Sequence, residues 1–261
     1  MSAITIPSSA AAEFERDGVY FAQHVIPHDL IERAAARMDA VIAGEYETGT
    51  EPHMRHFAES DPPEKVRKID DAHLADRTIF EVISHPSLGR WAAAVTGANM
   101  IQVWGTQLLV KPTNPTQKAK SGNIGWHQDM QYWQEWWDGE AFTAWIAVSD
   151  VTPNAGPVRF VRGSHAWGFL DQGDFWETDI DEQGSQIGRE RDWEEVPAIL
   201  APGGVSCHHR YTFHASGPNL EPFPRRSFAV HMRTEKCKAK PGQYYTSNLD
   251  NMNHCPIIYQ A

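Results

Sequence analysis

The second half of the chain carries a series of short β-rich segments, and this pattern limits the folds that the sequence can adopt. Glycine- and proline-rich turns separate these segments from one another. Short strands divided by such turns are typical of a sheet sandwich or a jelly roll. The segments, rich in the β-branched and aromatic residues that favour strands, are residues 101–110, 142–148, 158–161, 204–208 and 227–232.

The first part of the chain differs, because its apolar residues recur with helical spacing. Ser8 and Ser9 provide a polar cap for a first short helix, and Gly18 provides its stop. We therefore predict a mainly β fold with helices packed outside its sheets. The predicted early elements are helices over residues 10–17, 27–42 and 85–97, a strand over 19–21 and an irregular connection over 45–63.

With 261 residues the chain has the size of one large domain. We predict a single domain over residues 1–261, with helical support at about 8–97, a β core at about 100–235 and a C-terminal tail at 236–261. A composition of 41% hydrophobic and 22% charged residues is that of a soluble globular protein. No apolar stretch has the length of a membrane span and no signal peptide is recognisable, so a cytoplasmic location is expected.

Charge and cysteine content argue against several classes of function. The formal net charge of -11 disfavours general binding of nucleic acid, because such affinity is built mainly on phosphate neutralisation. The cysteines Cys207, Cys237 and Cys255 form an odd set without a CxxC spacing. This pattern favours reduced thiols over a disulfide framework or a thiolate zinc site.

Candidate metal ligands occur in two distant segments. His127 and Asp129 are two residues apart, and His214 follows downstream. Two histidines and one carboxylate on one face of a metal leave coordination positions open, as in non-haem Fe(II) oxygenases. Such an oxygenase takes electrons from a co-substrate, and an arginine suits the far carboxylate of a keto acid. Arg225 and Arg226 are adjacent on a predicted strand and point to opposite faces, so spacing alone does not choose between them.

These segments resemble the phytanoyl-CoA dioxygenase family of Fe(II)- and 2-oxoglutarate-dependent oxygenases. The family's His-x-Asp is similar to His127-Gln128-Asp129, and its His-x-Ser-Gly-Pro-Asn is similar to the segment that begins at His214. Arg225 lies eleven positions after His214, as the family's arginine does, so the resemblance favours Arg225 over Arg226. The likeness extends over about residues 13–232 and implies a double-stranded β-helix, the jelly-roll, cupin-like core of this superfamily, with flanking helices.

The resemblance also implies what each residue does. His127, Asp129 and His214 would hold Fe(II), and 2-oxoglutarate would chelate the iron and pair with Arg225, with O2 as oxidant and ascorbate as an optional reductant. Succinate and CO2 would be released while an unactivated C–H bond is hydroxylated. Further residues similar to the family's co-substrate pocket are Ser216, Trp145, Gln107, where some relatives have methionine, and Lys68.

Two alternatives remain open beside this hypothesis. One is a cupin-type metal enzyme that uses the same ligands without a keto acid, and the other is a non-catalytic binding protein on the same scaffold. Halogenation is disfavoured, because halogenating relatives replace the carboxylate with a small residue and this chain retains Asp129.

The remaining histidines and the aromatic residues have less specific roles. Strand alternation puts His208 on the side of His214, so we expect it to be buried in support of the ligands and not to be a ligand itself. Residues 171–195 are predicted as a lid, an oligomer contact or a solvated insertion. An aromatic cluster, which either lines a substrate cleft or packs in the core, comprises Trp126, Tyr132, Trp133, Trp136 and Trp137. Surface or hydrogen-bonded roles are expected for His24, His28, His53, His56, His73, His85 and His254.

The sequence favours a small organic molecule as substrate. Naming phytanoyl-CoA from the family would be analogy alone. An acidic chain is a poor match for a polyanionic CoA ester, although Lys111, Lys118 and Lys120 are predicted to supply a local basic rim.

Overall fold

The computed structural model describes residues 5–114, 116 and 120–261. Its strands are β1 (Val19–Ala22), β2 (Met54–Arg55), β3 (Arg67–Asp70), β4 (Met100–Lys111), β5 (Ile124–His127), β6 (Trp137–Asp138), β7 (Ala141–Ala147), β8 (Val158–Val161), β9 (Glu195–Pro197), β10 (Val205–His209), β11 (His214–Ser216), β12 (Arg225–Thr234), β13 (Lys238–Ala239) and β14 (Ile257–Gln260). Its α-helices are α1 (Ala10–Asp17), α2 (His28–Ile42), α3 (Arg77–Ile83), α4 (Pro86–Thr96), α5 (Met130–Trp133) and α6 (Ile180–Gly188). Short 3-10 turns occur at Ala72–Leu74, Lys120–Gly122, Ser164–Trp167 and Tyr244–Thr246.

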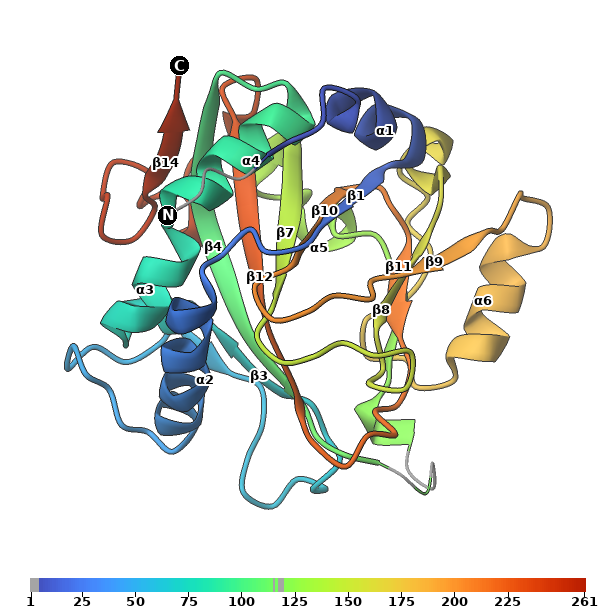
Figure 1. Cartoon of the computed structure of the whole chain (residues 1–261). Coiled ribbons are helices and arrows are strands. Elements are labelled where there is room, and N and C mark those ends of the chain that lie inside the picture. The colour runs from blue at the N-terminus through green and yellow to red at the C-terminus, as the bar shows by residue number, and fades with distance from the viewer. Residues whose placement is uncertain (1–4, 115, 117–119) are drawn as a thin grey trace.

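Two antiparallel sheets form the centre of the molecule (Figure 1). The larger sheet has the strand order β1-β10-β7-β12-β4-β3-β2, and β14 also pairs with β4. The smaller sheet has the order β5-β11-β8-β9. This is a jelly roll with flanking helices, so the predicted fold class is confirmed. Among the described residues, none of the helices has the length and apolar character needed to cross a membrane.

Helices α1 to α4 pack on the outer face of the larger sheet (Figure 1). The apolar face of α2 buries Leu30 and Ile31 in one core cluster with Ile146 and Phe228 from the sheet. Complete burial of such side chains stabilises the fold by about 1.5–3 kcal/mol each. Helix α4 ends at Gly97, whose φ of 68° is left-handed and therefore suits glycine. The helices thus fix the sheet from outside and leave its inner face to the site.

Most predicted elements are present with nearly the predicted bounds. The predicted cap of α1 is an exception, because Ser9 makes no side-chain capping hydrogen bond. The N-terminal segment is also more than a helical support, since it contributes β1, β2 and β3 to the larger sheet, and the C-terminal tail contributes β14. The sequence patterns do not predict α3, α6, β3 or β14, nor the short strands β5 and β11.

Candidate active site

The inner face of the larger sheet places its side chains in rows, because direct partners in antiparallel strands point to the same side. One row joins His231, Thr143 and His208 across β12, β7 and β10. The next row joins Asp70, Gln107, Ala229 and Trp145. Lys68 follows with Leu109 and Ser227, and the last row pairs Arg225 with Lys111.

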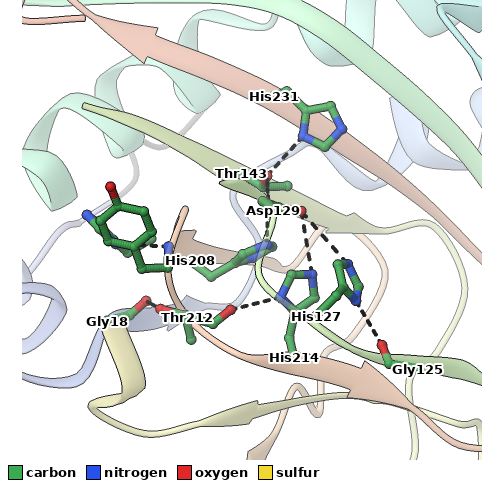
Figure 2. Close-up of polar contacts among 11 residues, drawn as sticks. Gly18, Gly125, His127, Asp129, Thr143, His208, Thr212, His214 and His231 are labelled. Atoms are coloured by element: carbon green, nitrogen blue, oxygen red, sulfur yellow. Dashed lines mark hydrogen bonds and ion pairs between the residues drawn. The ribbon is translucent and has the colours of Figure 1, made fainter. Parts of the chain in front are cut away.

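The three predicted metal ligands meet opposite this face. β5 and β11 pair so that His127 and His214 are direct partners, and their ring centroids lie 4.1 Å apart. Oδ1 of Asp129 is 3.9 Å from Nε2 of His127 and 3.7 Å from Nε2 of His214 (Figure 2). All three side chains are buried, and one donor atom from each falls within 4.8 Å of the others. The geometry is that of a site for a single ion.

The protonation of these groups suits a divalent metal. Nδ1 of His127 lies 2.8 Å from the Gly125 carbonyl, and Nδ1 of His214 lies 3.0 Å from the Thr212 carbonyl. Since a carbonyl oxygen only accepts, each Nδ1 carries the proton and each Nε2 presents its lone pair. Burial lowers the pKa of both imidazoles and keeps them neutral.

The carboxylate of Asp129 is ionised in this setting. Burial alone would raise its pKa, but the neighbouring histidines, His214 and His208 foremost, hold the pKa well below its usual range. Two neutral imidazoles and one carboxylate match the donor set of a non-haem iron centre with open positions. The residues present therefore fit the metal that the resemblance implies.

The second oxygen of Asp129 is held by the first row of the larger sheet. Thr143 Oγ1 donates to Oδ2 over 2.7 Å, and His208 Nε2 lies 3.0 Å from the same oxygen. Because an ionised carboxylate only accepts, Nε2 of His208 carries a proton. Behind Thr143, His231 Nδ1 lies 2.9 Å from the hydroxyl and donates to it, since the hydroxyl proton is directed to Asp129. Oδ1 is thereby left to face the metal position (Figure 2).

His208 is therefore buried beside Asp129 as expected, whereas Thr143 and His231 were missed. Neither residue belongs to a motif, and the inner face of β7 and β12 is known only once the strands are paired. The alternation within each strand could have grouped Thr143 with Trp145, and His231 with Arg225.

Replacement of His208 by phenylalanine is expected to weaken Fe(II) binding about 10- to 100-fold, the usual effect of losing a residue that orients a metal ligand. His208→Gln, which keeps a donor, should recover part of this loss. Fe(II) affinity is measured by anaerobic titration, with the protein's melting temperature as a check of folding. His209→Gln is the control, because the adjacent side chain accepts from Tyr211 N and not from the site. Equal affinities for His208→Phe and the wild type would rule out this positioning role.

Gly125, two residues before His127, has a packing role. Gly125 N donates to Phe175 O over 3.0 Å, and a Cβ at residue 125 would lie 2.0 Å from Asp174 O. Any side chain would therefore displace residues 173–177 from β5. Their close approach puts the ring of Phe175 5.1 Å from that of His127. This part of the predicted insertion 171–195 covers the metal site, as a lid would.

Arg225 and Arg226 point in opposite directions, as the strand predicts. Arg226 is directed outward and pairs with Asp39 of α2 over 2.9 Å. Arg225 is 2% exposed, donates to the Gly156 carbonyl and lies 5.1 Å above the ring of Trp145. Burial lowers its pKa to about 9, which leaves it charged at neutral pH. No carboxylate in the described part of the chain pairs with Arg225, and its Nε has no hydrogen-bond partner.

The prediction that Lys111 belongs to a basic rim is wrong, because this lysine faces the interior. Its strand position beside Arg225 buries it, and Nζ donates to the carbonyls of Gly122 (2.6 Å), Gly217 (2.7 Å) and Ser216 (3.2 Å). Burial, with the nearby charge of Arg225, lowers the pKa of Lys111 well below its usual value. Lys120 is paired with Asp179, and Lys118 lies outside the described residues. Lys111 instead ties the strand that carries His214 to the loop before β5.

The three metal ligands and Arg225 line a cavity with a volume of about 260 Å³, and the other predicted co-substrate residues line it too. Ser216, Trp145 and Gln107 contribute to its wall. Lys68 does so too, but its Nζ is 2.6 Å from Asp70 Oδ1 and 3.0 Å from His56 Nε2. His56 and Asp70 were not predicted as site residues, because His56 lies in a segment without a motif and its contact with Asp70 depends on tertiary packing.

The aromatic cluster divides between two roles. Tyr132, Trp133 and Trp136 line the cavity, whereas Trp126 and Trp137 are fully buried elsewhere in the core. Phe175 and Trp176 from the insertion also line the cavity. Both readings of the cluster were therefore correct for part of it.

The jelly roll and the buried group of two histidines and one carboxylate define a class, the non-haem metal enzymes with open coordination positions. The family model described as phytanoyl-CoA dioxygenase (PhyH) matches residues 14–227. The chain belongs to the phytanoyl-CoA dioxygenase family. The class of Fe(II)- and 2-oxoglutarate-dependent dioxygenase, which the resemblance implied, is thereby confirmed.

Individual relatives are distant. Human peroxisomal phytanoyl-CoA dioxygenase is 24% identical over 235 residues, which cover 86% of this chain and 67% of that protein. The chain spans 58% of the rat phytanoyl-CoA dioxygenase domain-containing protein 1, at 26% identity over 66% of this chain.

Solved structures agree in fold. The 2-oxoglutarate-dependent epimerase SnoN from nogalamycin biosynthesis has a TM-score of 0.70 and 19% identity, covering 95% of this chain and 97% of that chain. EctD from S. alaskensis with 2-oxoglutarate and 5-hydroxyectoine has a TM-score of 0.68 and 21% identity, covering 88% and 76%.

Proposed function

We propose that this protein hydroxylates an unactivated C–H bond of a small organic molecule, using 2-oxoglutarate and O2 and releasing succinate and CO2. His127, Asp129 and His214 bind Fe(II), and Arg225 binds the distal carboxylate of 2-oxoglutarate. The observation that carries this proposal is the buried charge of Arg225. A buried cation without an anionic partner is costly, and a dicarboxylate that reaches from the metal position to Arg225 would supply the partner.

Each wall residue then has a defined task. Bound iron with 2-oxoglutarate supplies the chemistry that activates O2 and removes hydrogen from the substrate. Thr143 and His208 hold Asp129 so that only Oδ1 is available to the metal. The ring of Trp145 packs against the guanidinium of Arg225 and holds it in place. Ser216 and Gln107 offer polar groups to the keto acid from the facing strands.

The outcome at the substrate carbon is a separate part of the proposal. Asp129 occupies the ligand position that halogenating relatives leave free for chloride, which disfavours halogenation. The structural neighbours include an epimerase and a carbocyclase as well as EctD, solved with a hydroxylated compound. Hydroxylation differs from these other reactions because an oxygen atom of O2 enters the product.

Reaction under ¹⁸O2 with a metabolite extract is expected to put one labelled oxygen atom into succinate and the other into a new hydroxyl group. Mass spectrometry of succinate and of the modified metabolite checks both. An unlabelled, isomerised or desaturated product would exclude hydroxylation while retaining the oxygenase class. Turnover without 2-oxoglutarate would favour the cupin-type alternative, and absence of succinate with all extracts would favour a binding protein.

The cytoplasmic location and the single-domain organisation stay predictions. The human relative is named as peroxisomal.

A further inference from the structure

We propose that the primary substrate carries a hydroxyl group on an apolar body, and that Nε2 of His231 accepts a hydrogen bond from this hydroxyl. This inference rests on the proposed function, because it names the substrate class of the same cavity. Three features of the cavity carry it: the position of His231 relative to Arg225, the aromatic walls around His231, and the hydrogen bonds that fix its ring proton.

The space for the substrate lies on the side of the metal site that faces away from Arg225. The row of side chains that contains His231 supports Asp129, and Arg225 comes six residues before His231 on β12. At about 3.3 Å per residue, roughly 20 Å of strand separate the two. 2-Oxoglutarate is proposed to lie between them, and the row of Lys68 is on its path. The end of the cavity beyond His231 is therefore left for the substrate.

Aromatic rings from three segments line this end of the cavity. A register shift between β4 and β12 leaves Trp104 without a strand partner, one residue beyond the pair of Gly105 and His231. The ring of Trp104 stacks on that of His231 with the centroids 5.2 Å apart, and the ring of Trp133 stands edge-on to His231 at 5.0 Å. Tyr245 packs where Gly105 has no side chain, because a Cβ at residue 105 would lie 3.2 Å from its ring. Such walls favour a molecule with an apolar body.

The hydrogen bonds around Thr143 decide which ring nitrogen of His231 is free. Thr143 has one hydroxyl hydrogen and directs it to the ionised Asp129, so Nδ1 of His231 donates to the hydroxyl oxygen. Burial lowers the pKa of His231 to about 4, which leaves a single ring proton at neutral pH. Because that proton is on Nδ1, Nε2 presents a lone pair. Figure 2 shows the second ring nitrogen of His231 on the side away from Thr143.

Two buried ring nitrogens at this end of the cavity lack hydrogen-bond partners in the described part of the chain. They are Nε2 of His231, which accepts, and Nε1 of Trp104, which donates. Buried polar atoms nearly always have a partner, so each unpaired one points to a group that binds there. An acceptor and a donor in stacked rings match a hydroxyl group, which both donates and accepts. A carbonyl oxygen only accepts and would leave Nε2 of His231 unpaired.

The test compares 1-indanol with 1-indanone, which share a carbon skeleton and differ in whether the oxygen carries a hydrogen. Protein loaded with 2-oxoglutarate and Zn(II), which has no redox chemistry and does not support turnover, is titrated with each compound. Dissociation constants are measured by ligand-observed NMR. We expect 1-indanol to bind about tenfold more tightly, because 1-indanone leaves a buried acceptor unpaired. Equal affinities, tighter binding of 1-indanone or binding of neither compound would overturn the proposal.

Variants of His231 assign the hydroxyl contact. His231→Phe removes the acceptor and keeps a flat ring, so the affinities for 1-indanol and 1-indanone should become equal. His231→Gln, which keeps an acceptor, should retain part of the preference. His28→Phe is the matched control, because the His28 side chain is 67% exposed at the start of α2. Weaker 2-oxoglutarate binding in His231→Phe with an unchanged preference for 1-indanol would place His231 on the co-substrate and overturn the assignment.

A variant of Tyr245 tests the place of the substrate without touching His231. Tyr245 follows residue 227, where the match to the family model ends. Tyr245→Ala should weaken both compounds about five- to tenfold and leave their ratio unchanged, because it removes a wall and not the acceptor. Tyr244→Ala is the control, since the Tyr244 ring stacks on His53 at 3.6 Å and is not among the described residues that line the cavity. Unchanged affinities in Tyr245→Ala would overturn the placement.

The same titration in Arg225→Ala separates this proposal from the proposed function. A preference for 1-indanol that persists in Arg225→Ala supports the hydroxyl contact even if succinate formation fails. Absence of the preference in protein that still forms succinate would refute the hydroxyl contact and leave the oxygenase intact.

Discussion

Replacement of Asp129 by alanine is expected to reduce oxygen-dependent succinate formation by at least about a thousandfold. Metal catalysis contributes several kcal/mol, and each 1.36 kcal/mol corresponds to about a factor of ten in rate. The variant removes the anionic ligand and leaves the donors of Thr143 and His208 without their acceptor. Iron retained after desalting and succinate formed per enzyme are the two measurements.

His127→Ala should have a comparable effect, because it removes a second ligand from the same group. Asp138→Ala is the control, since its carboxylate is exposed and lies 3.4 Å from Lys240. Turnover at the wild-type rate in Asp129→Ala or His127→Ala would contradict the assignment of these residues as metal ligands, even though the jelly-roll fold would stand.

Replacement of Arg225 by alanine is expected to raise the KM for 2-oxoglutarate by at least about 30-fold. Loss of one member of a buried charge pair costs about 2 kcal/mol or more, and 1.36 kcal/mol is about a factor of ten. The effect should fall on the KM for 2-oxoglutarate more than on Fe(II) affinity, because Arg225 touches none of the three ligands. Steady-state assays over a wide range of 2-oxoglutarate concentration measure it.

The adjacent arginine provides the control for this experiment. Arg226 has the same side chain on the same strand, but it faces outward and pairs with Asp39. Arg226→Ala should leave the KM for 2-oxoglutarate unchanged. An unchanged KM in Arg225→Ala as well would favour the cupin-type enzyme that uses no keto acid.

Local sequence was sufficient for much of the fold. The helices at residues 10–17 and 85–97 are marked by their glycine stops, and the long strands by their composition. The strands β5 and β11 were missed because they are short, with four and three residues, and because much of their sequence consists of the site residues themselves. The ligands were nevertheless found, since chemical type and spacing identify them without reference to strand boundaries.

Residues whose role depends on which strands are neighbours were predicted least well from the sequence. Lys111 looked like a surface lysine because lysine is usually solvated, yet its register beside Arg225 buries it. Thr143 and His231 gained their role only when β7, β10 and β12 aligned. His56 reached the cavity because the segment before β3 folds back on Asp70.

By itself the sequence determined the donor set of the metal site, the two candidate arginines and the β-rich, helix-flanked architecture. Residue type and apolar periodicity can be recognised within short segments of the chain, and these features depend on nothing else. The tertiary structure decided which oxygen of Asp129 is free, which arginine stays buried without an anion, and which polar groups meet the aromatic walls. These outcomes depend on strand register between residues far apart in sequence. A shift of one residue would turn every such side chain to the opposite face, and local sequence patterns do not specify that register.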